Sequence, residues 1–156
     1  GLPTIVTSCS NNYGPFQNEE KFIPTIILKL LKEEQVPIYG EGKNIRDWLY
    51  VADHAEALEL CMIKSMPNET YNIGGNAEKT NIEVFYTICR ELSSIINKDY
   101  EELLSKMEFV SDRPGHDSRY AIDTGKIEND FSWEPKYSFE KGIKETINWY
   151  LGKIKL

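Results

Sequence analysis

The sequence predicts an α/β fold, because short β-branched strands alternate with amphipathic helices along its 156 residues. Two strand-turn-helix units support this prediction, one beginning near Ile5 and the other at Glu69. Hydrophobic residues make up 40% of the chain, which is enough for one core of ordinary size. No apolar run is long enough to cross a membrane, so we expect a soluble globular protein.

The first unit is a strand followed by a helix. Ile5 and Val6 belong to a short strand that ends at the polar segment 10–15 (SNNYGP), which reads as a loop or turn. Apolar residues then recur at intervals of three and four residues. This spacing predicts a helix from Pro24 to about Gln35, with Pro24 in its first turn.

Two strands and a second helix should follow. Residues 37–51 (PIYGEGKNIRDWLYV) predict two short strands about a glycine-containing turn. Asp53 is placed to cap the next helix. That helix is expected to carry one apolar face formed by Leu58, Cys61 and Met62.

The second unit begins with the strand ETYNIGG (69–75) and leads into a long helix. Thr80 and Glu83 have the spacing of a capping box at the start of this helix. Its apolar stripe consists of Ile82, Phe85, Ile88, Cys89, Leu92 and Ile96.

The remaining elements are short except for the last. An acidic helix is expected near 100–104, and 107–111 (MEFVS) and 119–123 (RYAID) read as strands. Thr124 should cap a short helix that holds Ile127 and Phe131. A final helix starts at about Ser138 and carries Phe139, Ile143, Ile147 and Tyr150.

Charge and cysteine content exclude several classes of function. The net charge is −7 with acidic and basic residues mixed, which argues against nucleic-acid or anionic membrane partners. Cys9, Cys61 and Cys89 are odd in number and lie far apart, so we expect no metal or redox pair but packed, reduced thiols in a cytoplasmic protein. The chain begins without an initiator Met or a signal peptide, which we interpret as a piece of a longer protein.

The loop DRPGHDSRYAID (112–123) carries the strongest functional signal. Arginine and histidine side chains flank a Pro-Gly bend, so Arg113, His116 and Arg119 are candidates to converge on a doubly charged phosphate. The alternative is a surface loop in which the two arginines pair with the loop's own aspartates. The spacing alone leaves both readings open.

Several motifs match a fingerprint only in part. GGNAEKT (74–80) resembles a phosphate-binding loop, but Glu78 replaces the glycine before the lysine and would repel phosphate. Tyr-x-x-x-Lys spacings occur at 39–43 and 137–141, yet neither pair is expected to share a helical face. A GxxGxxG dinucleotide fingerprint is missing from the sequence, so the chain is not expected to cradle a dinucleotide by itself.

Single histidines and aromatic residues are weighed separately. His54 lies beside Asp53 in the first turn of its helix and is interpreted as structural. His116 fits a phosphate contact and a structural role equally well. Tyr39 and Trp48 either pack in the core, which is the commoner case, or offer a flat face to a base.

Several segments together resemble the dTDP-glucose 4,6-dehydratase family of the extended short-chain dehydrogenase/reductases, over nearly the whole chain. They are SNNYGP (10–15), KFIP (21–24), 37–51, ETYNIGGNAEKTN (69–81), 112–123 and WEPKYSFEKGI (133–143), of which NIRDWLYV and RPGHDSRYAID are the most specific. The resemblance departs from the family pattern at Phe22, where leucine is expected, and at Ser8, where asparagine is expected.

The resemblance implies that the chain is the C-terminal, sugar-nucleotide-binding part of such an enzyme. Residues of about 1–20 and 69–96 would be the last Rossmann strands and their helix, and the remainder would form a small mixed α/β substrate domain. The N-terminal half, which holds the glycine fingerprint and binds NAD, would lie outside the chain.

The resemblance also assigns site residues. Asn11 would contact the sugar nucleotide, and Asn12 would lie near NAD at the end of its strand. The nucleotide-diphosphate pocket would comprise Lys21, Phe22, Arg46, Asn81, Asp112, Arg113, Pro114, Gly115 and His116. The segment bordering the thymine would comprise Pro37, Ile38 and Tyr39.

In that family, a tyrosine base and NAD oxidise the sugar at C4, an acid/base pair removes water across C5 and C6, and the hydride returns to C6. The resemblance places these catalytic residues outside the chain, so the full-length enzyme would be an NAD-dependent lyase and a cytoplasmic homodimer, and this chain alone would be inactive. Three alternatives stay open: part of another sugar-nucleotide epimerase, decarboxylase or dehydratase; a stand-alone sugar-nucleotide binding module; or a structural domain with incidental arginines.

Overall fold

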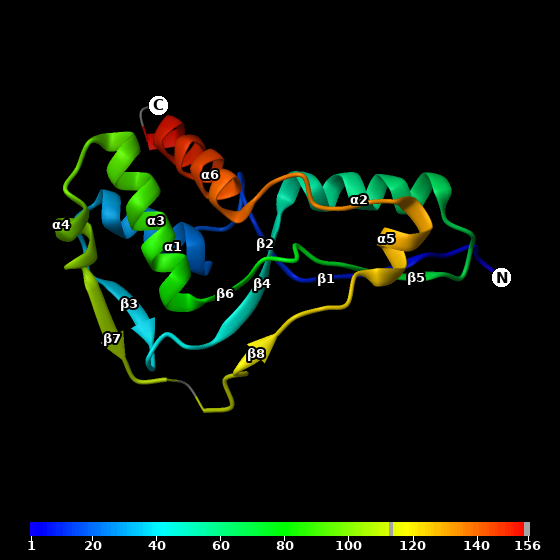
Figure 1. The fold of residues 1–156 in the computed structure, drawn as a ribbon, viewed down its shortest axis with the longest axis horizontal. Helices are drawn as coiled ribbons and strands as arrows, with labels where there is room; N and C mark the ends of the chain where they lie inside the picture. The colour runs from blue at the N-terminus through cyan, green and yellow to red at the C-terminus, as the bar shows by residue number, and fades with distance from the viewer. Residues whose placement is uncertain (113, 155–156) are drawn as a thin grey trace.

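The computed structural model describes residues 1–112 and 114–154, in which strands and helices alternate (Figure 1). In chain order, the elements are β1 (Val6–Cys9), β2 (Asn11–Tyr13), α1 (Phe22–Leu31), β3 (Val36–Tyr39), β4 (Ile45–Tyr50), α2 (Val51–Lys64), β5 (Thr70–Ile73), β6 (Glu78–Thr80), α3 (Asn81–Ile96), α4 (Tyr100–Leu104), β7 (Met107–Val110), β8 (Arg119–Tyr120), α5 (Gly125–Phe131) and α6 (Phe139–Ile154). None of these helices is long and apolar enough to span a bilayer.

The strands of the described residues form three small sheets, and β4 is the centre of the largest. The first half of β4 pairs with β6 in antiparallel and with β8 in parallel orientation, whereas its second half pairs with β2 in parallel. The other two sheets are the parallel pairs β1–β5 and β3–β7. The predicted α/β class with parallel strands is confirmed. The Rossmann origin of 1–20 and 69–96 stays a prediction.

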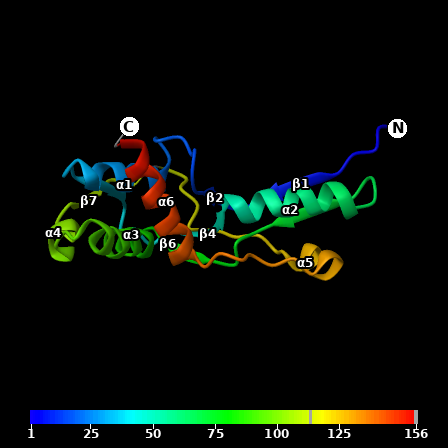
Figure 2. The same cartoon turned by 90° about the horizontal axis from the view of Figure 1, so that it is seen from above.

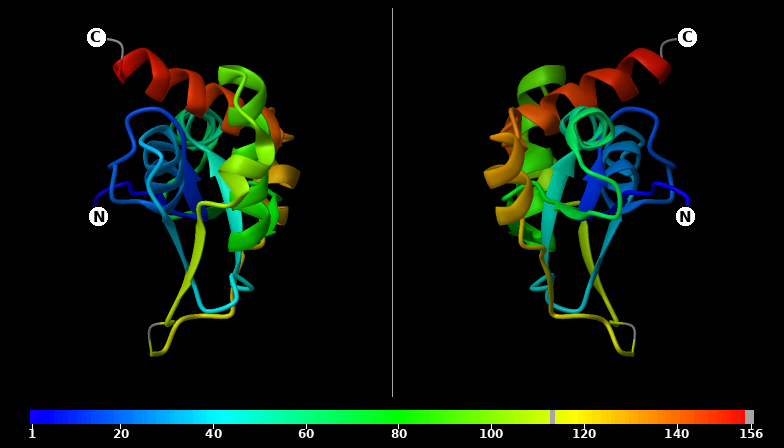
Figure 3. Two further views of the ribbon diagram at one scale, coloured as in Figure 1. Left: turned by 90° about the vertical axis from the view of Figure 1, so that its left-hand side faces the viewer. Right: turned by 90° about the vertical axis from the view of Figure 1, so that its right-hand side faces the viewer.

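Two hydrophobic cores lie on either side of β4 (Figures 1 and 2). The larger core is formed by α1, α3, α6 and the strands beside them, and includes Ile27, Phe85 and Tyr150. The smaller core, which includes Tyr71 and Trp133, lies among α2, α5 and the β1–β5 pair. Figure 3 shows that the β3–β4 turn and the described part of the β7–β8 segment meet at one end of the molecule.

The long helices form as their periodicity predicts. α3 has the capping box at its start, because the Thr80 hydroxyl accepts from the Glu83 amide and the Glu83 carboxylate accepts from the Thr80 amide. Most of its apolar stripe is buried, although Ile82 and Ile96 are only half-buried. α4 and α6 also lie where the sequence predicts them.

Two strands were not predicted. Residues 10–15 were expected to be a loop or turn, but 11–13 form β2, and 78–80 form β6 instead of a turn. Both are three-residue segments without β-branched runs, and both are strands because β4 supplies hydrogen-bonding partners from another part of the chain. The two strands predicted in 37–51 are confirmed as β3 and β4, and they pair with different neighbours.

The start and the buried face of α2 differ from the prediction. Asp53 does not cap the helix: Tyr50 occupies the N-cap position, and Asp53 is buried with its carboxylate accepting from the Tyr137 amide at 3.1 Å. The buried face of α2 includes Ala57 and Cys61, whereas Leu58 and Met62 are exposed. The buried Asp53 carboxylate on α2 binds the segment before α6. This tertiary contact, rather than the apolar pattern, sets which face of α2 is buried.

Other boundaries differ by a few residues. α1 begins at Phe22 and ends at Leu31, four residues before the expected end, because Glu33 adopts a left-handed backbone conformation (φ 61°). Pro24 lies in its first turn, as predicted. Thr124 precedes α5 without a side-chain cap, since its hydroxyl contacts Asn76 and Glu128.

The cysteines have the packing roles that were expected. All three thiols are free, and Cys61 and Cys89 are buried in the two cores. Burial raises the pKa of the Cys89 thiol to about 12, which makes it a poor nucleophile at neutral pH.

Candidate functional site

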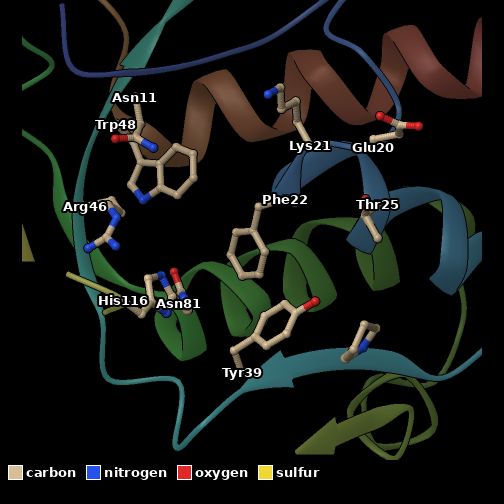
Figure 4. Close-up of a pocket in the computed structure, with 11 residues that line it drawn as sticks. Asn11, Glu20, Lys21, Phe22, Thr25, Tyr39, Arg46, Trp48, Asn81 and His116 are labelled. Atoms are coloured by element: carbon tan, nitrogen blue, oxygen red, sulfur yellow. The ribbon is translucent and has the colours of Figure 1, made fainter. Parts of the chain in front are cut away.

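A pocket of about 470 Å³ lies between α1, β3 and β4 and contains most of the residues singled out from the sequence (Figure 4). Eight predicted substrate contacts line it: Asn11, Lys21, Phe22, Pro37, Tyr39, Arg46, Asn81 and His116. They come from β2, the start of α1, β3, β4, the start of α3 and the β7–β8 segment. The tertiary structure therefore joins residues up to 105 positions apart, from Asn11 to His116.

One face of β4 forms the wall of the pocket. Side chains alternate along a strand, so Arg46 and Trp48 point to the same side and both line the pocket. The Arg46 guanidinium donates to two neutral carbonyls, to that of Ile45 at 2.7 Å and to that of Asp117 at 2.9 Å. Among the described residues Arg46 has no carboxylate partner, so its charge stays available to an anion.

The opposite face of β4 has a different role. Asp47 is buried, with 2% of its surface exposed, and its carboxylate accepts from the amides of Gly75 and Ala77 at 2.9 and 2.8 Å. These bonds attach the loop before β6 to the strand. Gly75 is required at this contact, because a Cβ atom there would lie 1.8 Å from the Trp48 carbonyl oxygen.

The start of α1 brings a cation and an aromatic ring to the pocket. Lys21 is the N-cap residue of α1, which has no side-chain cap, and Phe22 is its first helical residue. The Phe22 ring stacks on Trp48, with 6.2 Å between ring centroids and 21° between planes. Uncapped amides at a helix start and a neighbouring ammonium group both favour a negatively charged ligand. Glu20 also lines the pocket here and adds a negative charge.

β3 contributes an aromatic surface on the opposite side of the pocket (Figure 4). Pro37 and Tyr39 face the pocket, and Tyr39 is 44% exposed. Ile38 differs from its predicted role, because it is fully buried in the larger core and does not line the pocket. The period of two along a strand is the reason, since Ile38 points away from both of its neighbours.

Asn81 and His116 complete the pocket. Asn81 is the first residue of α3 and follows the capping residue Thr80. Its backbone N–H donates to the backbone carbonyl of Asn44 at 3.1 Å. The imidazole Nδ1 of His116 lies 2.7 Å from the Asp112 carboxylate. This contact fixes the orientation of the ring and places a carboxylate beside it.

Of the described loop residues predicted for the site, Asp112, Pro114 and Gly115 do not line the pocket. The Asp112 carboxylate contacts His116, which lines the pocket, and Pro114 and Gly115 are exposed. Gly115 has a left-handed backbone (φ 72°), as a turn at this position requires. Arg113 lies outside the described residues.

Arg119 does not converge with His116, and it does not pair with an aspartate of its own loop. Its guanidinium forms two bonds to the Glu78 carboxylate, at 2.7 and 2.6 Å. The pair lowers the pKa of Glu78 through a hydrogen bond and the opposite charge. Both alternatives for Arg119 were wrong, because β6 and β8 flank the same end of β4 and bring these two residues together.

Asn12, the residue predicted to lie near NAD, points away from the pocket. Its amide oxygen lies 2.8 Å from Nδ1 of His54, and its amide nitrogen donates to the Cys9 sulfur and the Ser10 carbonyl. Burial lowers the pKa of His54, which favours the neutral ring in this contact. The structural role predicted for His54 fits this geometry. The contact of Asn12 with NAD stays a prediction.

Three pocket residues were not assigned to the site from the sequence. Glu20 and Thr25 flank the start of α1, and Trp48 was interpreted as a core residue more readily than as a site residue. For Trp48 the alternation from Arg46 is the one signal that could have placed it in the pocket wall.

Comparison with known proteins places the chain in a family. The family described as GDP-mannose 4,6 dehydratase matches residues 1–146. A dTDP-glucose 4,6-dehydratase of Salmonella typhimurium is 54% identical, and the match covers 99% of this chain and 43% of that protein. A dTDP-glucose 4,6-dehydratase of Xanthomonas campestris is 50% identical, over 97% of this chain and 43% of that protein. The chain thus spans less than half the length of these relatives.

Solved structures show the same fold. A dTDP-glucose 4,6-dehydratase of Bacillus anthracis, in complex with NAD, has 45% identity and a TM-score of 0.84, with 99% of this chain and 46% of that one covered. A UDP-glucose 4-epimerase of Thermotoga maritima, with UDP-glucose, has 29% identity and a TM-score of 0.82, with 96% and 46% covered. On the match over residues 1–146, the chain belongs to the nucleotide-sugar dehydratase family described as GDP-mannose 4,6 dehydratase.

Proposed function

We propose that the chain forms the substrate-binding part of an NAD-dependent dTDP-glucose 4,6-dehydratase, a lyase that converts dTDP-glucose to dTDP-4-keto-6-deoxyglucose. The observation that carries the proposal is the pocket, which combines three basic side chains, Lys21, Arg46 and His116, with aromatic rings in a chain of net charge −7. The relatives at 50 to 54% identity, which bear the name of this enzyme, support the same choice.

The two sides of the pocket would hold different parts of the ligand. Tyr39 and Pro37 offer a flat apolar surface to the thymine. The Phe22 ring lies between Tyr39 and Trp48 (Figure 4). Arg46 and Lys21 would hold the diphosphate, since a guanidinium can donate two parallel hydrogen bonds to phosphate oxygens. Asn11 and Asn81 are amides that can both donate and accept, which suits hydroxyl groups of a sugar.

NAD would supply the oxidation at C4 and the later return of the hydride. The chain offers little of a dinucleotide site, because the sequence has no GxxGxxG segment and Asn12 is already bonded to His54. The residues described here would therefore bind and orient the sugar nucleotide, and the NAD site and the catalytic residues would belong to the rest of the enzyme. We propose that the full-length enzyme is a cytoplasmic homodimer; the free cysteines fit a reducing compartment.

Calorimetric titration of the 156-residue chain with dTDP, UDP and GDP tests the assignment of the pocket. We expect dTDP to bind most tightly, because Tyr39 and Pro37 border the base. Preference for UDP or GDP would favour another sugar-nucleotide epimerase, decarboxylase or dehydratase. The Thermotoga maritima epimerase, which has the same fold, is an example of this alternative. No binding of any nucleotide would contradict the proposal.

Turnover separates an enzyme part from a binding module. The full-length protein with dTDP-glucose and NAD is expected to form the 4-keto product, whereas the 156-residue chain with the same additions is expected to form none. Conversion by the chain alone would overturn the assignment of the catalytic residues to the rest of the enzyme. A full-length protein that binds dTDP-glucose without converting it would favour the stand-alone binding module.

A further inference from the structure

The indole N–H of Trp48 is buried without a hydrogen-bond acceptor. Trp48 is 6% exposed, and its Nε1 atom has no partner among the described residues. A buried donor that stays unpaired costs free energy, so proteins leave few of them. The same holds for the Nε1 atom of Trp133, but that residue lies in the smaller core and lines no part of the pocket.

None of the described neighbours of Trp48 accepts this hydrogen bond. Its ring packs against the aromatic rings of Tyr13, Phe22 and Phe139. In the close-up, the indole nitrogen is on the side of the ring that faces Arg46 (Figure 4). A guanidinium has five donors and no acceptor. Two donor groups, one of them cationic, therefore face each other at the pocket wall.

An anionic oxygen at this place would satisfy both donors. A phosphate oxygen has lone pairs for two hydrogen bonds, and its charge compensates the guanidinium. The position agrees with the rest of the pocket, because Tyr39, the surface for the base, lies on the opposite side from Trp48 (Figure 4). We infer that Trp48 Nε1 donates a hydrogen bond to a phosphate oxygen of the bound diphosphate, and that Arg46 donates to the same phosphate group. This inference rests on the proposed function.

Nuclear magnetic resonance tests the hydrogen bond directly in the unmodified chain. The three tryptophans give three indole 1H–15N signals, assigned with Trp48→Phe and Trp133→Phe variants. Saturation with dTDP or with inorganic pyrophosphate should move the Trp48 indole proton downfield and leave the Trp133 signal in place. Thymidine, which lacks phosphate, should not produce this shift. An unmoved Trp48 signal in the dTDP-saturated chain would overturn the inference.

A pair of matched variants gives the energetic test. Both Trp48→Phe and Trp133→Phe remove an unpaired buried donor, but only the first removes a phosphate contact. We expect Trp48→Phe to weaken dTDP binding about tenfold, since bonds to charged acceptors are stronger than neutral ones. Trp133→Phe should bind as the unmodified chain does. Equal affinity of Trp48→Phe and the unmodified chain would overturn the inference. If the variant does not fold, the indole 1H–15N spectra of the unmodified chain provide the test instead.

The outcomes separate this inference from the proposed function. If pyrophosphate moves the Trp48 signal but dTDP binds no better than UDP and GDP, the indole contact stands and the proposed substrate is wrong. If dTDP binds tightly without moving the signal, the proposed function stands and the indole contact is wrong. If neither anion binds, both are wrong.

Discussion

The two faces of β4 differ in how their polar groups are satisfied. On one face, both carboxylate oxygens of Asp47 accept amide hydrogen bonds in a buried setting. On the other face, Arg46 has no carboxylate partner among the described residues and Trp48 has a donor without an acceptor. Consecutive residues of one strand thus serve opposite purposes. Groups that the chain satisfies internally hold the fold, and groups that it leaves unsatisfied in a pocket are available to a ligand.

The same contrast separates the two arginines beside β4. Arg119 lies on β8, next to β4, and forms an exposed ion pair with Glu78. Within the described part of the chain, Arg46 donates to backbone carbonyls and to no carboxylate. Counting arginines in the sequence cannot distinguish these cases, because the carboxylate partner of Arg119 lies 41 residues away in the chain.

The largest effect is expected from breaking the satisfied face. Asp47→Ala leaves the amides of Gly75 and Ala77 unpaired, so the free energy of unfolding should fall by about 3 kcal/mol. Urea unfolding monitored by circular dichroism measures this loss. Asp117→Ala, at an exposed position, is the control and should change the free energy by less than about 0.5 kcal/mol. A loss below about 1 kcal/mol for Asp47→Ala would contradict the structural role.

Breaking the pocket face should affect binding more than folding. Arg46→Gln is expected to lower the affinity for dTDP by about 10- to 100-fold, because a bidentate charged contact to phosphate is worth roughly 1.5 to 3 kcal/mol. Titration calorimetry measures the change. Arg119→Gln is the matched control and should bind dTDP as the unmodified chain does, since Glu78 already occupies its guanidinium. Equal losses in both variants would mean that net charge, rather than the pocket, attracts the ligand.

The smallest effect is expected on β2, where Asn11 lines the pocket and Asn12 contacts His54. Because burial lowers the folded-state pKa of His54, the unfolded chain takes up this proton first as the pH falls through about 6.5. The stability contributed by neutral His54 is therefore complete above that pH and is lost below it. Thermal unfolding between pH 7.5 and 5.5 should show a steeper loss for the unmodified chain than for His54→Gln. Identical slopes would contradict the neutral ring.

Much of the fold could be predicted from local sequence. The capping box of Thr80 and Glu83 and the apolar periods of α3 and α6 depend on residues three to four positions apart, so one segment contains all the information. Strands β2 and β6 were not predicted, because they depend on residues far away in the sequence. Each exists because β4 pairs with it across a long stretch of sequence.

The candidate site divides in the same way. Residue patterns alone were enough to predict the α/β class, and the resemblance named eight of the residues that line the pocket. Three features became visible only in the folded chain: Ile38 belongs to the core, Arg119 is bound to Glu78, and the Trp48 indole N–H has no acceptor among the described residues. The physical reason is that residue type sets which bonds a side chain can make, whereas the neighbours brought together by folding determine which of those bonds are already made.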